Sequence, residues 1–154
     1  MLINLILFLT MLAYSVIVSQ SFMYILSLRH MQVNLQATEY IAVRKLIDAG
    51  MNSRFRYVFY VALLLSLLLV VVCAFYASGL LFISACIAFV ALVADTIITV
   101  KGNLPINAEI NSWTKDQFPN DWGEYRIRWL TFYQYRQILN ITGFVCLVAG
   151  VVFG

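Results

Sequence analysis

The chain has 154 residues, of which 63% are hydrophobic and only 11% are charged, and its formal net charge is +3. Soluble domains average about 45–50% apolar and about 25% charged residues, so this composition excludes an ordinary soluble domain and indicates an integral membrane protein. Basic and acidic residues are interleaved along the chain, which argues against binding to nucleic acid. We expect one all-α domain over residues 1–154, an integral membrane four-helix bundle with short amphipathic cytoplasmic helices.

The first apolar run covers about residues 2–28 and contains no charge, glycine or proline. It is long enough to cross the bilayer as a helix, and it lacks the basic start and the cleavage motif of a signal peptide. Ser15 and Ser19 recur at helical spacing and predict a small polar stripe that faces neighbouring helices. Gln20 is a candidate for lining a polar cavity. Beyond the run, the helix either continues as far as residue 49 or bends near Arg29.

The connection 29–56 contains a second helical pattern. Thr38 is the expected N-cap of a short amphipathic helix and Gly50 is its expected C-terminal stop. Within it, Arg44 and Asp48 have the spacing of an i,i+4 ion pair. We expect this helix to lie against the bundle or on the membrane surface.

The second and third apolar runs cover about residues 57–76 and 80–100. Tyr57 and Tyr60, beside basic residues, have the pattern of an interfacial aromatic belt. The short link 77–79 predicts that the two helices form an antiparallel hairpin.

Asp95 is the most informative residue of the third run. A carboxylate is costly in hydrocarbon, so an acid at this depth is a functional candidate by default. Alternatively, it lies close to the interface and pairs with an arginine. Both interpretations require a partner for Asp95.

The connection 101–136 contains both prolines and all three tryptophans of the chain. Pro105 is expected to end the third helix, because residues before proline avoid the α region. A short surface helix over residues 106–113 and a loop over 115–120 should follow. Asp121 is then the expected N-cap of a new helix.

That new helix has an unusual stripe. Five aromatic and basic residues lie on one face at steps of four and three: Trp122, Arg126, Trp129, Tyr133 and Arg136. The stripe is either an interfacial belt that contacts lipid phosphates or a defined site with cation–π contacts. We expect it to face the third helix and Asp95.

The fourth apolar run, about residues 137–153, continues the same helix. Gly143 and Gly150 predict close helix packing, and Asn140 predicts a hydrogen bond between helices.

The basic residues predict the orientation of the chain. Every Lys and Arg lies in one of the two connections, 29–56 and 101–136. The positive-inside bias therefore places both connections in the cytoplasm and both termini on the non-cytoplasmic side.

No metal or cofactor is expected. His30 is the only histidine, and the spacing of Cys73, Cys86 and Cys146 fits no zinc or haem motif. The cysteines are expected to be small buried hydrophobes with a free thiol.

The polar segment before the fourth run combines two groups of residues, namely Asn103, Pro105, Asn107, Ile110 and Trp113, followed by Asp121, Trp122, Arg126, Trp129 and Arg136. This combination resembles the membrane domain-of-unknown-function family that includes fungal anthrone oxygenases. The resemblance implies a four-helix transmembrane bundle and, for some members, cofactor-independent oxidation of anthrones to anthraquinones. The chain departs from the pattern at Tyr133, where a histidine, the natural proton acceptor, is common.

Three functions remain open. The first is an accessory membrane protein that binds a partner subunit, a lipid or a small hydrophobic molecule, with these ligand-contacting residues: Gln20, Asp95, Asn103, Asn107, Trp122, Arg126, Trp129 and Arg136. The second is a membrane enzyme for an aromatic or quinone-like substrate, in which Asp95 is base or orienter, Tyr133 donates a hydrogen bond, and Arg126 and Arg136 stabilise an oxyanion. A transporter is third, because one buried acid and no internal repeat offer little for a pathway. Convergence of the four enzymatic candidates on one pocket would distinguish the first two.

Overall fold

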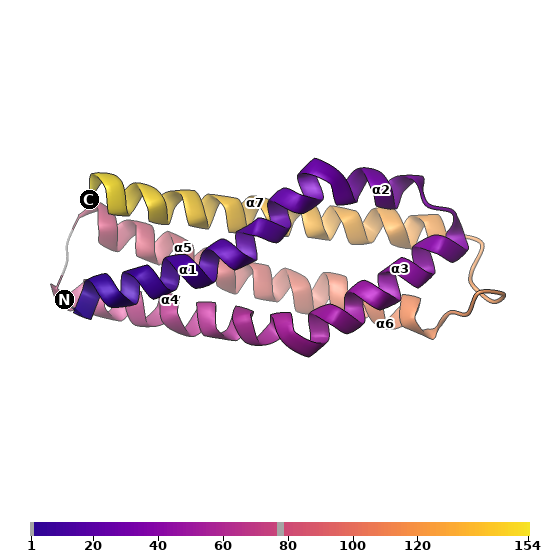
Figure 1. Cartoon of the computed structure of the whole chain (residues 1–154), viewed down its shortest axis with the longest axis horizontal. Helices are drawn as coiled ribbons and strands as arrows, with labels where there is room; N and C mark the ends of the chain where they lie inside the picture. The colour runs from indigo at the N-terminus through magenta and orange to yellow at the C-terminus, as the bar shows by residue number, and fades with distance from the viewer. Residues whose placement is uncertain (1, 77–78) are drawn as a thin grey trace.

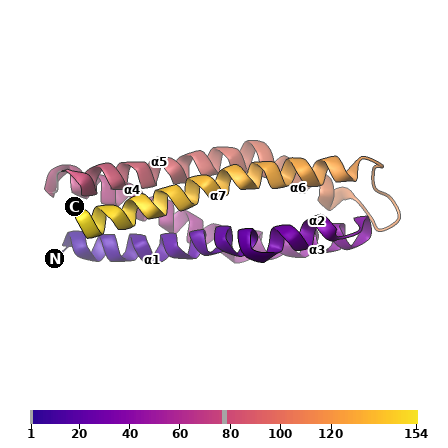
Figure 2. The same ribbon diagram turned by 90° about the horizontal axis from the view of Figure 1, so that it is seen from above.

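The computed structural model describes residues 2–76 and 79–154, and every regular element in these two ranges is helical. Four long helical segments lie side by side in an elongated bundle and alternate in direction (Figures 1 and 2). By length and composition, each is able to cross a membrane: Leu2–Asn34, Ala37–Tyr76, Leu80–Ser112 and Trp122–Phe153. The predicted all-α four-helix bundle is confirmed.

Three of the four long segments contain one π-helical turn, called η1, η2 or η3. In chain order, the elements are α1 (Leu2–Met23), η1 (Tyr24–Leu28), α2 (Arg29–Asn34), α3 (Ala37–Gly50), η2 (Met51–Phe55), α4 (Arg56–Tyr76), α5 (Leu80–Ile98), η3 (Thr99–Asn103), α6 (Leu104–Ser112) and α7 (Trp122–Phe153). The packing pairs are α1 with α4, α4 with α5, α5 with α7, and α7 with α1. The expected antiparallel hairpin of α4 and α5 is present, although residues 77–78 of its link lie outside the described ranges.

The short helices α2, α3 and α6 continue the long helices instead of lying separately on a surface. The first segment passes through η1, ends at Asn34 and does not reach residue 49. Gly50 has helical angles, φ −65° and ψ −41°, and α3 continues through η2 into α4. The predicted stop at Gly50 is therefore wrong, because glycine permits the end of a helix but does not impose it.

Two further helix boundaries differ from the prediction. Thr38 is not the N-cap of α3, because the helix already begins at Ala37. Gln36 is the N-cap, and it forms a capping box with Glu39. Pro105 does not end the third helix: Asn103 and Leu104 before it keep helical angles, and the π turn η3 carries the helix past the proline. The expected apolar face of this segment is nevertheless buried, as Ile106 and Ile110 show.

The fourth helix is continuous from Trp122 to Phe153, as predicted. Asp121 occupies its N-cap position but forms no side-chain capping hydrogen bond. Gly150 packs against α5, where a Cβ atom would lie 2.6 Å from the Ser84 Cβ. Close packing at glycine is thus confirmed. Asn140 is buried on α7 beside the Asp95 carboxylate of α5, where the predicted contact between helices would lie, while its Oδ1 has no partner among the described residues.

The first helix turns a different face to the bundle than predicted. Ser19 is exposed and Ser15 is partly exposed, and each hydroxyl donates to a carbonyl one turn back in the same helix. A serine satisfied in this way does not need a neighbouring helix. Tyr14, Ile17 and Ser21 are the residues that α1 buries.

The bundle has two hydrophobic cores. Near the termini, α1, α4, α5 and the end of α7 form the aliphatic half around residues such as Ile17, Leu69, Leu92 and Leu147. At the opposite end, α2, α3, α6 and the beginning of α7 form the aromatic half, whose buried members are Tyr24, Tyr40, Ile41, Ile106, Ile110, Trp113, Trp129 and Tyr133. Figure 1 shows both termini at one end and the two basic connections at the other.

The length of the bundle exceeds the thickness of a bilayer. A segment of 33 residues spans about 50 Å at about 1.5 Å per residue, whereas the hydrocarbon core is about 30 Å thick. The aliphatic half presents an apolar outer surface, with Phe8, Leu64, Val90 and Val145 exposed. It is therefore the half suited to lipid. The side of the membrane on which the termini lie stays a prediction.

Candidate functional site

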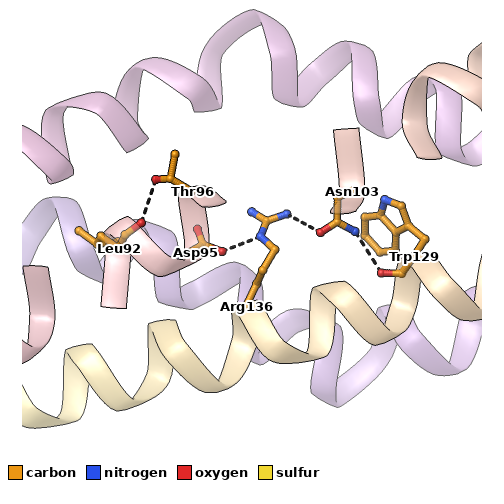
Figure 3. A network of polar contacts seen from close by, with 6 residues as sticks. All are labelled: Leu92, Asp95, Thr96, Asn103, Trp129 and Arg136. Atoms are coloured by element: carbon orange, nitrogen blue, oxygen red, sulfur yellow. Dashed lines mark hydrogen bonds and ion pairs between the residues drawn. The ribbon is translucent and has the colours of Figure 1, made fainter. Parts of the chain in front are cut away.

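Asp95 and Arg136 form a buried ion pair between α5 and α7 (Figure 3). The Asp95 carboxylate is 0% exposed, and the Arg136 Nε donates to its Oδ1 at 2.6 Å. The other carboxylate oxygen, Oδ2, has no partner among the described residues. The predicted contact of the α7 stripe with Asp95 is confirmed at Arg136.

Two asparagines, one turn apart on η3 and α6, each hold one arginine. Asn103 Oδ1 accepts from Arg136 Nη1 at 3.3 Å, while its Nδ2 donates to the Trp129 carbonyl at 3.0 Å. Asn107 Oδ1 accepts from Arg44 Nη2 at 2.9 Å, while its Nδ2 donates to Asp48 Oδ1 at 2.8 Å. We call Asn103 with Arg136 and Asn107 with Arg44 the two asparagine–arginine units. In both, a neutral amide orients a guanidinium group without neutralising its charge.

Trp129 connects the two asparagine–arginine units. Its Nε1 donates to Asn107 Oδ1 at 2.8 Å, and its ring is the platform for the Arg44 guanidinium, whose Cζ lies 3.8 Å from the ring centroid. Tyr133 stacks on Trp129 with a centroid distance of 5.0 Å and an interplanar angle of 12°. Tyr24 packs on Tyr133 at 4.2 Å and closes this aromatic stack.

Arg44 is the least expected member of the site. It is only 3% exposed, and its Nε has no hydrogen-bond partner among the described residues. The predicted ion pair with Asp48 is absent: over residues 2–76 and 79–154, no carboxylate lies within ion-pairing distance of Arg44. The two side chains instead bind the opposite ends of the Asn107 carboxamide.

A cavity of about 350 Å³ lies beside the two units, between the segment α3–η2–α4 and the segment α5–η3–α6. Its size falls within the range of small-molecule sites. Its lining has a polar part with Arg44, Asp48, Asn52, Arg56, Thr96, Thr99, Asn103, Asn107 and Arg136, and an apolar part with Ile47, Met51, Phe55, Phe59, Tyr60, Val100 and Leu104. Two π turns, η2 and η3, therefore meet at this cavity, and such turns are frequent at functional sites.

The four candidates for an enzymatic site do not converge on the cavity. Arg136 is the only one of them that lines it. Arg126 donates to the carbonyls of Gln32 and Leu35, at 3.3 and 3.0 Å, and so closes the end of α2. Asp95 lies behind Arg136, and Tyr133 is enclosed in the aromatic stack.

Two of the predicted ligand-contacting residues, Trp122 and Gln20, contact other side chains of the protein. Trp122 packs on Tyr40 and lies under Arg126, whose Cζ is 4.6 Å from the indole centroid. Gln20 donates from Nε2 to the Met51 sulfur at 3.5 Å. Neither Trp122 nor Gln20 lines the cavity.

Sequence reasoning did not identify the α3 and η2 side of the site. Arg44 follows Tyr40 by four residues and so shares its buried face, a position at which a charge signals a specific partner. Phe55, the last residue of η2, and Phe59, in the first turn of α4, repeat at the same spacing. These two signals could have identified that wall of the cavity.

No protein-family model matches the chain, and the searches of curated proteins and of solved structures found no significant match. The resemblance to anthrone oxygenases therefore stays a prediction. Among the residues that the structure describes, no group of three or more His, Cys, Asp or Glu side chains could hold a metal ion. The side chains that surround the cavity are therefore the basis for a functional proposal.

Proposed function

We propose that this membrane protein binds a small amphipathic molecule in the cavity between η2 and η3. The composition of the cavity wall is the observation that supports the proposal. One part presents aromatic and aliphatic side chains, and the other presents arginines and asparagines. Ligand sites combine a mostly apolar wall with a few fixed polar groups in this way.

The polar groups of the cavity are held in place before a ligand arrives. Arg136 is fixed by Asp95 and Asn103, and Arg44 is fixed by Asn107 and the Trp129 ring. Fixed donors reduce the conformational entropy that binding would otherwise cost. The arrangement therefore favours recognition of a polar head over nonspecific uptake of hydrocarbon.

The ligand enters from the membrane side. Tyr60 lines the cavity and is 60% exposed, and Tyr57 lies beside Arg56, which donates to its hydroxyl. Tyrosines beside arginines are typical of the membrane–water interface. At that depth, an amphipathic molecule keeps its chain in hydrocarbon and places its head between the helices.

Cofactor-independent oxidation of an aromatic or quinone-like substrate, with dioxygen as the oxidant, is our second proposal and has less support. The carboxylate of Asp95 would be its base, and the unpartnered Oδ2 is the observation that favours it. A general base must reach the proton that it removes, whereas Asp95 is 0% exposed and lies behind Arg136. Binding in an accessory role requires no such access, and we rank it first.

Photoaffinity labelling with a neutral probe tests the binding proposal. Purified protein in lipid nanodiscs is irradiated with hexadecanol that carries a diazirine in its chain, and the labelled peptides are mapped by mass spectrometry. We expect saturable labelling within residues 51–60 and 96–104, which line the cavity.

Two matched variants on the third helix control this experiment. Val100→Trp fills the cavity wall, and Val90→Trp places the same bulk on the lipid-facing surface. Both positions are largely exposed, at 53% and 62%, so the fold should accept either change. Labelling that is lost in Val100→Trp and kept in Val90→Trp supports the proposal. Equal labelling in both variants would contradict it.

A further inference from the structure

We infer that the head of the bound molecule is an anion, a phosphate or a carboxylate, and that it binds Arg44 and Arg136 at the inner end of the cavity. This inference rests on the proposed function and specifies the class of its ligand. Its starting point is the charge of the cavity wall. Three arginines, Arg44, Arg56 and Arg136, face the cavity together with one acid, Asp48.

The acids near the cavity do not balance these arginines. Asp95 neutralises Arg136 through a direct ion pair. Both oxygens of Asp48 accept from amides, those of Asn107 and Asn111, at 2.8 and 2.7 Å. With both acids counted, the wall still has an excess of positive charge. An anionic head would remove that excess.

Arg44 is the arginine of the cavity wall that most requires an anion. It is a guanidinium group that is almost fully buried, and no carboxylate pairs with it in the described part of the chain. The contacts that stabilise it, the Trp129 ring and the hydrogen bonds to Asn107 and the Tyr24 hydroxyl, are all with neutral groups, so none of them neutralises its charge. Its buried Nε also lacks a hydrogen-bond partner among the described residues. The Arg44 guanidinium group therefore still lacks a negatively charged hydrogen-bond acceptor.

Arg136 supplies a second donor toward the same space. Its Nε and Nη1 bind Asp95 and Asn103, and its Nη2 forms no hydrogen bond with a described residue (Figure 3). Asn103 and Asn107, which accept from the two guanidinium groups, are one helical turn apart, roughly 5.4 Å along the helix. An anion with several oxygens can accept hydrogen bonds from both guanidinium groups, the geometry for which arginine is suited. The Thr99 hydroxyl, which is also without a partner, lines the cavity and offers one more donor.

The apolar wall determines what is attached to the anion. Phe55, Phe59 and Leu104 line the cavity together with Tyr60, whose exposed ring marks the side that opens outward. A chain attached to the head would cover these side chains and leave between the helices toward the lipid. Burial of apolar area contributes about 25 cal/mol per Å², so a free inorganic anion would leave this wall unused. The site therefore fits an anionic amphiphile.

Three probes with the same chain test the inference on the full-length protein in nanodiscs. Hexadecanol, hexadecanoate and hexadecyl phosphate are titrated, and binding is measured from the shift in melting temperature and from competition with the diazirine probe. We expect both anions to bind at least about tenfold more tightly than hexadecanol, since one additional charge-assisted hydrogen bond accounts for that factor. Equal affinities of the three probes would overturn the anion assignment and leave the proposed function intact. If no probe binds in a way that Val100→Trp blocks, the proposed function fails as well.

A matched pair of arginine variants locates the head. Arg44→Gln should reduce the preference for the anions to about twofold or less, while Arg54→Gln, at an exposed position of η2 in the same long helix, should leave it unchanged. If the preference persists in a folded Arg44→Gln protein, the assignment to Arg44 is wrong. The comparison of probes on the unmodified chain decides the inference even where Arg44→Gln does not fold.

Inorganic phosphate is the last competitor to be tested against the diazirine probe. It should compete with the diazirine probe far more weakly than hexadecyl phosphate does, because it cannot cover the apolar wall. Competition of equal strength would overturn the amphiphile and indicate a site for a free anion.

Discussion

The aliphatic half and the aromatic half of the bundle are held together by different means. In the aliphatic half, small residues such as Ala88 and Gly150 bring helices close together, and hydroxyls such as that of Ser66 bind a carbonyl of their own helix. In the aromatic half, Asn103 and Asn107 bind groups on other elements. The aliphatic half also has hydrogen bonds between helices, from the Thr10 hydroxyl to Leu65 and from the Tyr14 hydroxyl to Ala88, but these are single bonds to backbone carbonyls. That half therefore depends mostly on shape, and the aromatic half depends more on a network of side-chain hydrogen bonds.

This difference explains where the cavity lies. A helix pair that packs through small residues leaves no space between its backbones. The cavity lies where η2 precedes α4 and η3 follows α5, and the polar groups of the aromatic half begin there. The Asp95–Arg136 ion pair lies at the boundary between the two halves and ties α5 to α7 there.

The largest effect on the free energy of unfolding should follow from breaking the ion pair at this boundary. Arg136→Leu leaves the buried Asp95 carboxylate without its counter-ion, and we expect it to lower the free energy of unfolding by about 3–5 kcal/mol. Thermal or denaturant unfolding in detergent, followed by circular dichroism, measures it. The double variant Asp95→Leu/Arg136→Leu should recover most of the loss, because an apolar pair replaces the buried charge. Equal losses in the single and double variants would contradict the view that the unpaired acid is the cause.

A smaller loss is expected from the amide network of the aromatic half. Asn107→Leu keeps a similar volume but removes one hydrogen bond each from Arg44, Trp129 and Asp48. Each buried group left unsatisfied costs about 1–3 kcal/mol, so we expect a loss of about 3 kcal/mol in the same unfolding experiment. A loss below about 1 kcal/mol, within the range of one ordinary hydrogen bond, would show that the network does not stabilise this half.

The aliphatic half should respond instead to added volume. A Cβ atom at Gly143 would overlap the Tyr14 hydroxyl and lie 3.0 Å from the Ala91 Cβ, so Gly143→Ala should destabilise by about 2 kcal/mol. Gly50→Ala is the matched control, because a Cβ atom there meets nothing within 4 Å. Alanine also favours the helix over glycine by about 0.5–1 kcal/mol, so the control should gain stability. A similar change in both variants would argue against close packing at Gly143.

The smallest effect is expected from removing a polar group in the aliphatic half. Ser66 is buried, and its hydroxyl donates to the Leu63 carbonyl at 2.9 Å within the same helix. That carbonyl keeps its backbone partner, so Ser66→Ala should change the free energy of unfolding by no more than about 0.5 kcal/mol. A loss comparable with that of Asn107→Leu would remove the distinction between the halves.

The sequence alone predicted the features that depend on local pattern. The four apolar runs, the pairing of Asp95 with an arginine and the continuous helix after Asp121 follow from hydropathy, burial cost and helical spacing. The helix boundaries at Gly50 and Pro105 were wrong, because π turns carry the helices past residues that usually end them.

The candidate site was predicted only on one side. Asn103, Asn107 and Arg136 were expected and line the cavity, whereas Arg44 was assigned to an i,i+4 ion pair with Asp48. Its burial depends on Asn107 and Trp129, which are more than sixty residues away in the chain. Contacts over such separations follow from how α3, α6 and α7 pack, and no local pattern specifies them.

The most direct test of the account is whether the head of a bound amphiphile touches the two asparagine–arginine units. Solid-state NMR can measure phosphorus–nitrogen dipolar coupling between hexadecyl phosphate and nitrogen-labelled arginines of the protein in bilayers. We predict coupling to the guanidinium nitrogens of Arg44 and Arg136, and loss of the Arg44 contribution in Arg44→Gln. Coupling confined to exposed arginines such as Arg54 and Arg128, or no coupling at all, would contradict the placement of the head at Arg44 and Arg136.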